Sequence, residues 1–240
     1  YSFLGRNGFP VSTDAGVCYD VNAESEGFGK RHSASSRDML TGNMIACLDE
    51  KGQSYLYTVM YYDDHDRVIQ RKSNNRLNGG VEKDYIAYNF IGQPTKHKHI
   101  HSAAGKATQS EVYSYSYDYA DRLQTTTHCL NNGPVMTLVN NEYDELGRLK
   151  HNRRNGQSNL HTNYAYNLRS WTESISSPLF CETLYYNDTR SNPTNTRYYN
   201  GNISGMDWSV NGDKKRGYDF SYDNLSRLLY ADYLENNIRN

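Results

Sequence analysis

The sequence predicts an all-β protein, a long antiparallel meander of hairpins that forms a curved, partly spiralled sheet. Three observations predict this fold class. A Tyr-Asp unit with the chemistry of a turn recurs along the chain, Asn-Gly pairs fall between its copies, and the segments between turns alternate in polarity. The composition agrees, because 23 of the 240 residues are tyrosine and only 36% are hydrophobic, which suits a half-hydrated sheet.

The N-terminal 40 residues differ from the rest. They are rich in Gly and Ser and show no sustained period, so residues 1–40 are predicted to be an irregular segment with a short strand near Val17–Val21. Strand pairing is predicted to resume near Met44–Leu48. No low-complexity linker divides the remainder, so residues 41–240 are predicted to form one domain of repeated β-hairpins.

The repeated unit reads Tyr, then Asp or Asn, two variable residues, a turn residue, and often Arg with an aliphatic residue. An Asp or Asn side chain can hydrogen-bond the backbone two residues on, and Gly best tolerates the fourth position, so each copy is predicted to join two strands. Gly92 and Gly147 fill this fourth position in two copies, and looser turns are expected where Ser170 and Ser226 replace Gly. The six copies begin at Tyr62-Asp63, Tyr88-Asn89, Tyr117-Asp118, Tyr143-Asp144, Tyr166-Asn167 and Tyr222-Asp223, and a degenerate copy begins at Tyr186-Asn187.

A second kind of turn lies between successive copies. Asn-Gly between alternating runs is a strong short-range hairpin signal, and the alternation is clear at Tyr113, Tyr115 and Tyr117, which share one strand face. Two alternating kinds of turn predict an up-and-down ribbon with almost no helix. The signals are Asn78-Gly79, Ala104-Gly105, Asn132-Gly133, Asn155-Gly156, Ser176-Ser177-Pro178, Asn200-Gly201 and Asn211-Gly212.

Taken together, these residues resemble the Rhs/YD-repeat family, most closely the forms found in large Bacteroidetes proteins. The resemblance covers roughly residues 40–235, and a single Tyr-Asp turn would be weak evidence whereas six in register are strong. It implies a β-ribbon that spirals into a hollow shell around a cargo polypeptide, as in Rhs polymorphic toxins, insecticidal toxin complexes and teneurins. The stretches that carry it include Tyr143–Leu149, Tyr166–Thr172, Tyr199–Met206 and Arg216–Leu228.

The resemblance implies a non-catalytic structural segment of a secreted or cell-surface bacterial protein. Its partners would be the remainder of its own full-length chain, both the shell and a C-terminal cargo or toxin. The family's self-cleavage signature ends in Tyr-Asp-Pro, which is absent here, so we expect no enzyme activity. The chain begins at Tyr1 with neither Met nor a signal peptide, so we expect a fragment of a larger protein. At about 16 Å² of sheet per residue the chain is too small to enclose an ordinary domain. We therefore expect an open panel of a β-shell, whose exposed end strands invite an edge-strand dimer.

The alternative is an extracellular β module that binds carbohydrate or another surface ligand, because tyrosine is abundant and aliphatic residues are scarce. Trp171 and Trp208 could stack on sugar rings, although packing between sheet layers is the favoured interpretation. A net charge of −1 does not fit a nucleic-acid-binding protein, and no apolar run approaches the ~20 residues that span a membrane. No cofactor is predicted, because phosphate-loop and related motifs are missing.

Two clusters contain residue types that bind metals. His97, His99 and His101 alternate along one predicted strand, yet spacing fixes no Cys or acidic partner for them, so a polar sheet face is favoured. The stretch Asp63–Asp66 includes His65 and is acidic enough for a cation, but it lacks the calcium-loop pattern and falls in a turn of the repeat. No metal site is therefore predicted.

The four cysteines lie far apart and form no C-x-x-C pair, so zinc and redox motifs are not indicated. Free, partly buried thiols are favoured, while the even number leaves two disulfides open. These cysteines are Cys18, Cys47, Cys129 and Cys181.

Overall fold

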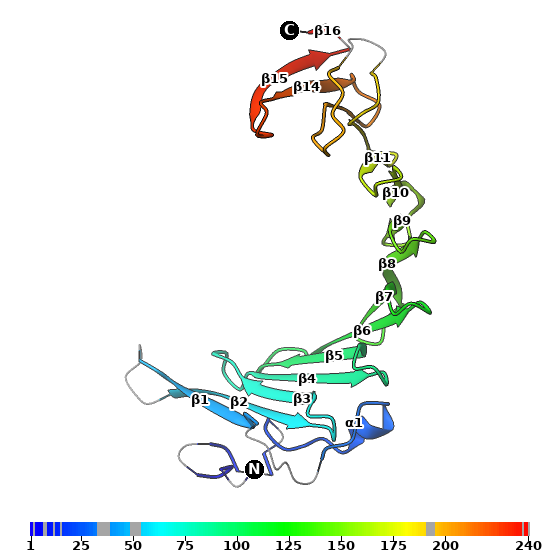
Figure 1. Ribbon diagram of the computed structural model, residues 1–240. Coiled ribbons are helices and arrows are strands. Elements are labelled where there is room, and N and C mark those ends of the chain that lie inside the picture. The colour runs from blue at the N-terminus through cyan, green and yellow to red at the C-terminus, as the bar shows by residue number, and fades with distance from the viewer. Residues whose placement is uncertain are drawn as a thin grey trace. The chain divides into compact units, whose positions relative to one another are not determined.

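The computed structural model describes two compact units, Tyr1–Met136 (unit 1) and Thr137–Asn240 (unit 2) (Figure 1). Both are built almost entirely from antiparallel strands that pair in chain order, so the prediction of an all-β antiparallel meander is confirmed. The structure describes residues 1, 3–6, 9–11, 13–14, 16–32, 39–48, 54–190, 195–236 and 238–239.

In unit 1, each strand from β1 to β7 pairs antiparallel with the next. A four-residue helix precedes them, and Figure 1 shows it beside the sheet. The elements are α1 (Asn22–Ser25), β1 (Gly42–Cys47), β2 (Ser54–Tyr62), β3 (Val68–Asn74), β4 (Val81–Tyr88), β5 (Pro94–Ser102), β6 (Gln109–Tyr117) and β7 (Leu123–Leu130).

Unit 2 continues the same pattern, and its strands again pair antiparallel in sequence order. Its one unusual connection runs from β12 to β13 through residues 186–204. The elements are β8 (Met136–Tyr143), β9 (Leu149–Arg154), the single 3-10 turn η1 (Ser158–Leu160), β10 (His161–Tyr166), β11 (Thr172–Ser176), β12 (Phe180–Tyr185), β13 (Gly205–Val210), β14 (Arg216–Tyr222), β15 (Leu228–Glu235) and β16 (Ile238–Arg239).

The strand predicted near Val17–Val21 is wrong. This stretch crosses the sheet without pairing as a strand, because its buried side chains pack onto one sheet face instead. Val17 is fully buried against Tyr61, whose hydroxyl donates a hydrogen bond to the Val17 carbonyl. The buried amide of Gln70 mimics a strand neighbour, accepting from the Asp20 N–H at 3.0 Å and donating to the Asp20 carbonyl at 2.8 Å. The N-terminal segment thereby covers one face of β2–β4.

The Asn-Gly turns differ in how closely they follow the prediction. Asn155-Gly156 and Asn211-Gly212 have positive φ at both residues, between 48° and 74°, as a two-residue hairpin turn of type I′ requires. At Asn132-Gly133 the positive values fall one residue earlier, at Asn131 and Asn132, so the turn is shifted. Asn200-Gly201 lies within the long β12–β13 connection, where Gly201 has a φ of 97° and packs closely against Trp171.

Candidate functional site

Six corners with one shared geometry stand at the ends of β2, β4, β6, β8, β10 and β14. In each, the N–H of the first residue donates to the carbonyl of the fifth at 2.8–3.0 Å, and the N–H of the fourth donates back to the carbonyl of the first. The fourth residue always has a positive φ, between 61° and 91°. The corners, each named from its first to its fifth residue, are Asp63–Arg67, Asn89–Gln93, Asp118–Arg122, Asp144–Arg148, Asn167–Trp171 and Asp223–Arg227.

A carboxylate clamps four of these corners. In Asp118, Oδ1 accepts hydrogen bonds from the N–H groups of Ala120 at 2.9 Å and Arg122 at 3.0 Å, while Oδ2 accepts one from Arg122 Nε at 2.7 Å. The same three bonds recur in the corners that begin at Asp63, Asp144 and Asp223. One side chain therefore fixes both the bend of the backbone and the position of the arginine.

The two Asn corners keep this design with neutral groups. Asn89 Oδ1 accepts from the Gln93 N–H at 2.8 Å, and Asn89 Nδ2 donates to Gln93 Oε1 at 2.8 Å, so an amide pair replaces the ion pair. Asn167 Oδ1 accepts from the N–H groups of Arg169 and Trp171 at 2.9 and 3.0 Å. In the four Asp corners the fifth residue is Arg, which offers donors to the carboxylate, and at Asn89 it is Gln93, which offers an acceptor to the amide. The Asn167 corner ends in Trp171 and has no such side-chain pair.

The looser turns expected at Ser170 and Ser226 are wrong. The Ser170 N–H donates to the first residue of its corner at 2.9 Å and the Ser226 N–H at 3.0 Å, against 3.1 Å for Gly92. Both serines adopt a φ near 61°, the same as Asp66 and Asp121. The side chain of the first residue explains the difference, since two backbone N–H groups that donate to its Oδ1 hold the backbone in place and offset the strain of a left-handed residue.

At three corners and at the degenerate copy, the preceding tyrosine makes a hydrogen bond to the corner before it. Tyr88 donates its hydroxyl to the carbonyl of Val68 at 3.0 Å, and Tyr117 donates to Pro94 at 2.8 Å. Each acceptor is the residue directly after the preceding corner. Tyr166 repeats the pattern on Leu149, and Tyr186 of the degenerate copy repeats it on Thr172. Tyr62 and Tyr222 donate instead to the carbonyls of Leu40 and Ile203, while Tyr143 precedes the first corner of unit 2.

The fifth residue reaches forward to the following corner. Arg67 Nη1 donates to the Asn89 carbonyl at 3.2 Å, and its guanidinium lies 4.8 Å above the Tyr88 ring. Arg148 makes the equivalent contacts at 3.2 Å with the Asn167 carbonyl and at 4.7 Å with the Tyr166 ring. Gln93, although neutral, also reaches forward, to the Asp121 carbonyl at 2.7 Å. These contacts and the tyrosine bonds make a line of hydrogen bonds from corner to corner, which we call the corner relay.

A register shift accompanies every corner at the same place. Tyr61 pairs with Gln70 but Tyr62 pairs with Val68, so Ile69 is an extra residue in β3. The same one-residue shift follows the corners after β4, β6, β8, β10 and β14. A bulge of this kind bends its strand and increases the local twist, so the repeat sets the twist of the sheet at regular intervals.

Hydrogen bonds lower the pKa of the carboxyl group at three of the clamps, Asp118, Asp144 and Asp223. At Asp118 the largest cause is the Arg122 side chain, and at Asp223 it is the backbone N–H of Arg227. At Asp144, burial raises the pKa, but hydrogen bonds from the backbone and side chain of Arg148 outweigh this effect and leave the pKa below its usual value. The pKa values of Asp118, Asp144 and Asp223 are therefore lowered, so the charged form that accepts these hydrogen bonds is favoured.

The two tryptophans are half-buried and pack against their neighbours. The Trp171 ring lies 5.0 Å from the Tyr186 ring, with the Arg169 guanidinium 5.1 Å from it. Trp208 stacks on Tyr218 with ring centroids 5.6 Å apart. Both rings thus contact side chains of their own sheet and of its β12–β13 connection, rather than a second sheet layer.

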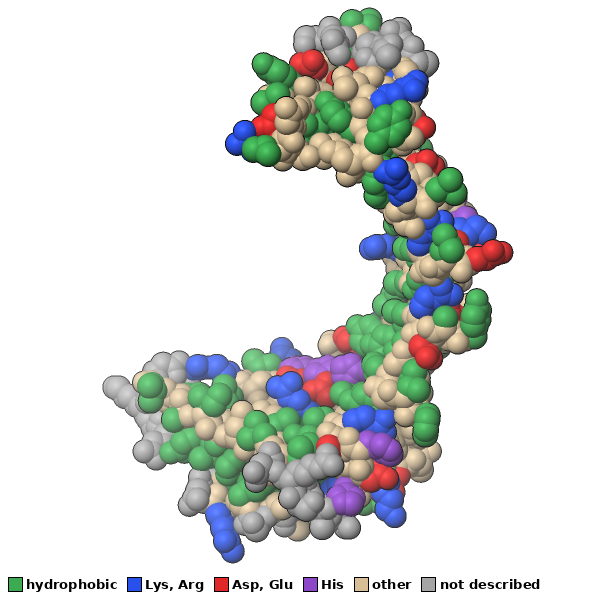
Figure 2. Space-filling model, in the orientation of Figure 1, with side chains coloured by type: hydrophobic (Ala, Val, Ile, Leu, Met, Phe, Trp, Pro, Cys, Tyr) green, Lys and Arg blue, Asp and Glu red, His purple; other side chains and the backbone are tan. Residues whose placement is uncertain are grey.

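The three alternating histidines gather on the sheet face of unit 1 opposite the N-terminal segment, and Figure 2 shows a strip of histidine side chains (purple) against acidic ones (red). Asp84 Oδ1 lies 3.0 Å from His97 Nε2 and 2.9 Å from His99 Nδ1. Glu82 lies 3.1 Å from His99 Nε2 and 2.7 Å from His101 Nδ1. We call these five residues the histidine ladder.

The acidic stretch at the first corner is the second candidate for cations. Asp63, Asp64 and His65 each bring one ligand atom within 4.8 Å of the others. However, both carboxylate oxygens of Asp63 are occupied, one by two backbone N–H groups and the other by Arg67. The described geometry therefore agrees with turn chemistry at this position.

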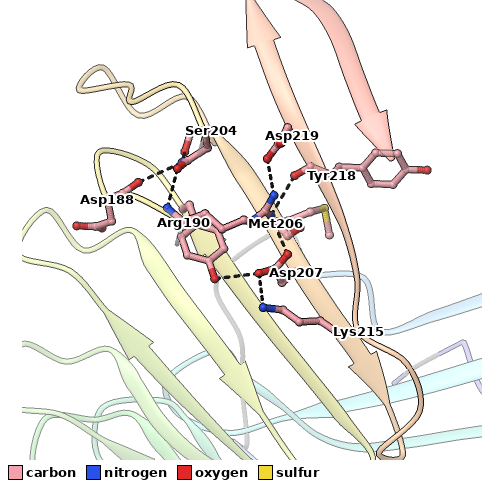
Figure 3. Close-up of polar contacts among 10 residues, drawn as sticks. Asp188, Arg190, Ser204, Met206, Asp207, Lys215, Tyr218 and Asp219 are labelled. Atoms are coloured by element: carbon pink, nitrogen blue, oxygen red, sulfur yellow. Dashed lines mark hydrogen bonds and ion pairs between the residues drawn. The ribbon is translucent and has the colours of Figure 1, made fainter. Parts of the chain in front are cut away.

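A buried ion cluster in unit 2 was not predicted (Figure 3). Arg190, which is 2% exposed, forms ion pairs with Asp207 and Asp219, and its Nη2 donates to the Met206 carbonyl at 2.8 Å. Lys215 adds a contact to Asp207 at 2.8 Å. Arg190 therefore ties the β12–β13 connection to β13 and β14. The only signal in the sequence was the degenerate repeat at Tyr186-Asn187, because the partners of Arg190 are 17 and 29 residues away.

Two further features complete the description. All four cysteines are free thiols, with Cys18, Cys47 and Cys129 half-buried and Cys181 exposed. Within the described part of the chain, no helix has the length and apolar character needed to cross a membrane.

Comparisons with known proteins identify no family. A scan against protein-family models finds no match, and a search of curated proteins finds none either. Solved structures with similarity include a TcdB2-TccC3-Cdc42 crystal structure, at 11% identity and a TM-score of 0.39 over 79% of this chain and 12% of that one. TcdB2-TccC3 without its hypervariable C-terminal region aligns at 11% identity and a TM-score of 0.37, over 81% and 12%. The Photorhabdus luminescens Tc holotoxin pore, in a TccC3 mutant form, aligns at 12% identity and a TM-score of 0.32, over 76% and 9%. This chain therefore spans about an eighth or less of the length of these neighbours.

Proposed function

We propose that the chain is a non-catalytic wall segment of a larger β-shell, which in its full-length protein encloses or presents a C-terminal cargo polypeptide. The observation that carries this proposal is the corner relay. In it the clamp, the tyrosine and the fifth residue make hydrogen bonds from one corner to the next. Polar side chains of the repeat are therefore engaged in building the sheet.

The amount of exposed surface supports a wall. Two separate globular units of these lengths would together expose about 13,200 Å². The chain exposes 15,002 Å², because long stretches of single-layer sheet bury few side chains. Large exposed apolar side chains at the corners, such as Phe90, Leu146 and Leu168, add to this surface. Surface of this kind suits a segment that meets further parts of its own protein.

The carbohydrate-binding alternative has weaker support. Contacts with Tyr186 and Arg169 already occupy the Trp171 ring, which leaves less of it for a sugar. A shallow depression of about 430 Å³ between β8 and β10, lined by polar groups that include His151, His161 and Asn163, is the feature that a sugar would fit. We further propose that the full-length protein is secreted or lies on a bacterial cell surface.

Two experiments test the wall proposal. Reading the gene on both sides of the region that encodes this chain should reveal further Tyr-Asp corners and, after them, a cargo sequence; a flanking enzyme domain with no further corners would contradict the proposal. Limited proteolysis of the full-length protein should then leave the cargo protected while the shell is intact.

A glycan array with the purified chain tests the alternative. We expect no specific sugar binding. Specific binding that is lost in Trp171→Ala and retained in the matched variant Trp208→Ala would replace the wall proposal with the carbohydrate-binding one.

A further inference from the structure

The histidine ladder brings imidazole side chains of β5 next to carboxylate side chains of β4, which are 13 to 19 residues away in the sequence. His97, His99 and His101 share one face of β5 because alternate strand residues point the same way. The β4–β5 register places Asp84 opposite His99 and Glu82 opposite His101. The acidic partners that the spacing of the histidines did not supply thus come from the neighbouring strand.

Two imidazoles converge on one carboxylate oxygen. His97 Nε2 and His99 Nδ1 lie 3.0 and 2.9 Å from Asp84 Oδ1. For a tetrahedral zinc ion with bonds of about 2.0–2.2 Å, ligand atoms stand roughly 3.3–3.5 Å apart. The two distances to Asp84 need to change by only a few tenths of an ångström. The ligand nitrogens of His97 and His99 are not within 4.8 Å of each other, so both rings have to rotate about their broad χ2 torsions to admit an ion.

His99 also has the second interaction that metal-binding histidines generally need. Its Nε2 lies 3.1 Å from Glu82 Oε2, an oxygen that is buried and has no aligned hydrogen bond. A histidine that binds metal through one nitrogen usually donates the other N–H to a carboxylate. With the proton on Nε2, His99 would satisfy Glu82 and leave the lone pair of Nδ1 directed to the side of Asp84.

The charge and accessibility of this face suit a cation. Asp84 contributes a carboxyl group to this face, held in place by hydrogen bonds with His97 at 3.0 Å and His99 at 2.9 Å. Two glutamates add negative charge to this face: Glu82 of β4 and Glu111 of β6, which lies opposite His99. Arg71 of β3, opposite Asp84, adds one positive charge. Each of the three histidine side chains is about one-third exposed, which leaves a route for an ion from solvent.

We propose that the histidine ladder binds one divalent transition-metal ion through His97, His99 and Asp84, with Glu82 orienting His99. Two histidines and one carboxylate form a three-ligand set that leaves a coordination position for water or for a group on another molecule. This inference is independent of the wall proposal, because it concerns the chemistry of one sheet face.

The experiment is Zn²⁺ binding to the whole chain at pH 7.5, measured by equilibrium dialysis and calorimetry. One ion per chain is expected. His99→Gln and Asp84→Asn should each weaken binding by at least about 100-fold, and Glu82→Gln by roughly 10- to 100-fold. Circular dichroism checks that each variant folds, and His97→Gln tests the same ligand set if one does not.

His65→Gln is the matched control, since His65 lies with Asp63 and Asp64 in a separate cluster whose ligand atoms are within 4.8 Å of one another. It should bind Zn²⁺ like the unchanged chain. Absence of Zn²⁺ binding, binding that survives His99→Gln, or binding that is lost in His65→Gln would each overturn the assignment.

Discussion

The first corner offers a direct test of the clamp by exchange of one natural pair for another. At Asp63–Arg67 the pair is carboxylate and guanidinium, and at Asn89–Gln93 it is two amides. Asp63→Asn keeps the Oδ1 acceptor for two backbone N–H groups but places an amide donor against Arg67 Nε and Nη2, which now lie 2.7 Å from Oδ2. Arg67→Gln alone removes the guanidinium donors and leaves the Asp63 carboxylate opposite a neutral amide. The double variant recreates the amide pair.

The size of the effect follows from burial. The Asp63 side chain is 7% exposed and Arg67 26%, so breaking the pair costs less than the 3–5 kcal/mol of a fully buried one, and we expect about 2 kcal/mol for Asp63→Asn. Arg67→Gln should cost about 1.5 kcal/mol. The double variant should cost about 2 kcal/mol rather than the sum of the two, since the new amide hydrogen bond restores roughly 1.5 kcal/mol of coupling.

Urea unfolding of the four proteins, followed by far-UV circular dichroism, gives the free energies for the cycle. Asp64→Asn serves as the control, because Asp64 is exposed and contacts only the adjacent His65. Its unfolding midpoint should match that of the unchanged chain. A double variant that loses the full sum of the single changes would refute the claim that Asp-Arg and Asn-Gln are equivalent clamps.

Three further predictions follow from the described geometry. The Leu146 amide donates to Asp144 Oδ1, so its NMR signal should shift with pH, with a midpoint below pH 3.8. Because the pKa of Asp144 is lowered in the folded chain, the stabilisation by this clamp is present above pH 3.8 and is lost as the pH falls through the folded pKa. Amide signals in the corners that begin with Asn should show no such shift. Burial lowers the pKa of Lys72 from 10.5 to about 8, so Lys72→Met should raise the unfolding free energy at pH 7 by up to roughly 3 kcal/mol. This gain should shrink as the pH rises from 8 toward 10.5. A variant less stable than the unchanged chain at pH 7 would contradict this prediction. Arg190→Met leaves Asp207 buried without its arginine and should lower the unfolding free energy by about 3–5 kcal/mol in thermal or urea unfolding, and an unchanged midpoint would show that the cluster is not stabilising.

Features that depend on near neighbours could be predicted from the sequence. The clamp joins a residue to those two and four positions later, so a single copy such as Asp118–Arg122 contains all of its chemistry. The alternation of tyrosines along β6 likewise followed from strand geometry alone. The strength of the clamp was underestimated at Ser170 and Ser226, because propensity for a left-handed residue does not include hydrogen bonds from its neighbours.

Contacts between residues that are far apart in the sequence could not be predicted. The link from Asp20 to Gln70 joins residues 50 positions apart, and nothing periodic in the N-terminal segment marks it. Half of the histidine ladder could be predicted from the sequence, because its histidines alternate along one strand. Its carboxylates lie 13 to 19 residues earlier and come next to the histidines only through the β4–β5 register. Arg190 depends in the same way on strands that follow it.

The corner relay has a consequence for how such a chain can change in length. Among the first three corners, Val68 and Pro94 each offer the carbonyl directly after a corner to the tyrosine of the next one. Arg67 and Gln93 each donate forward to a backbone carbonyl of the next corner. An in-frame duplication of one period, such as the 26 residues from Tyr62 to Ala87, would supply each new junction with the groups it needs. Genes of this type can therefore gain or lose whole periods by recombination without a new interface having to evolve each time.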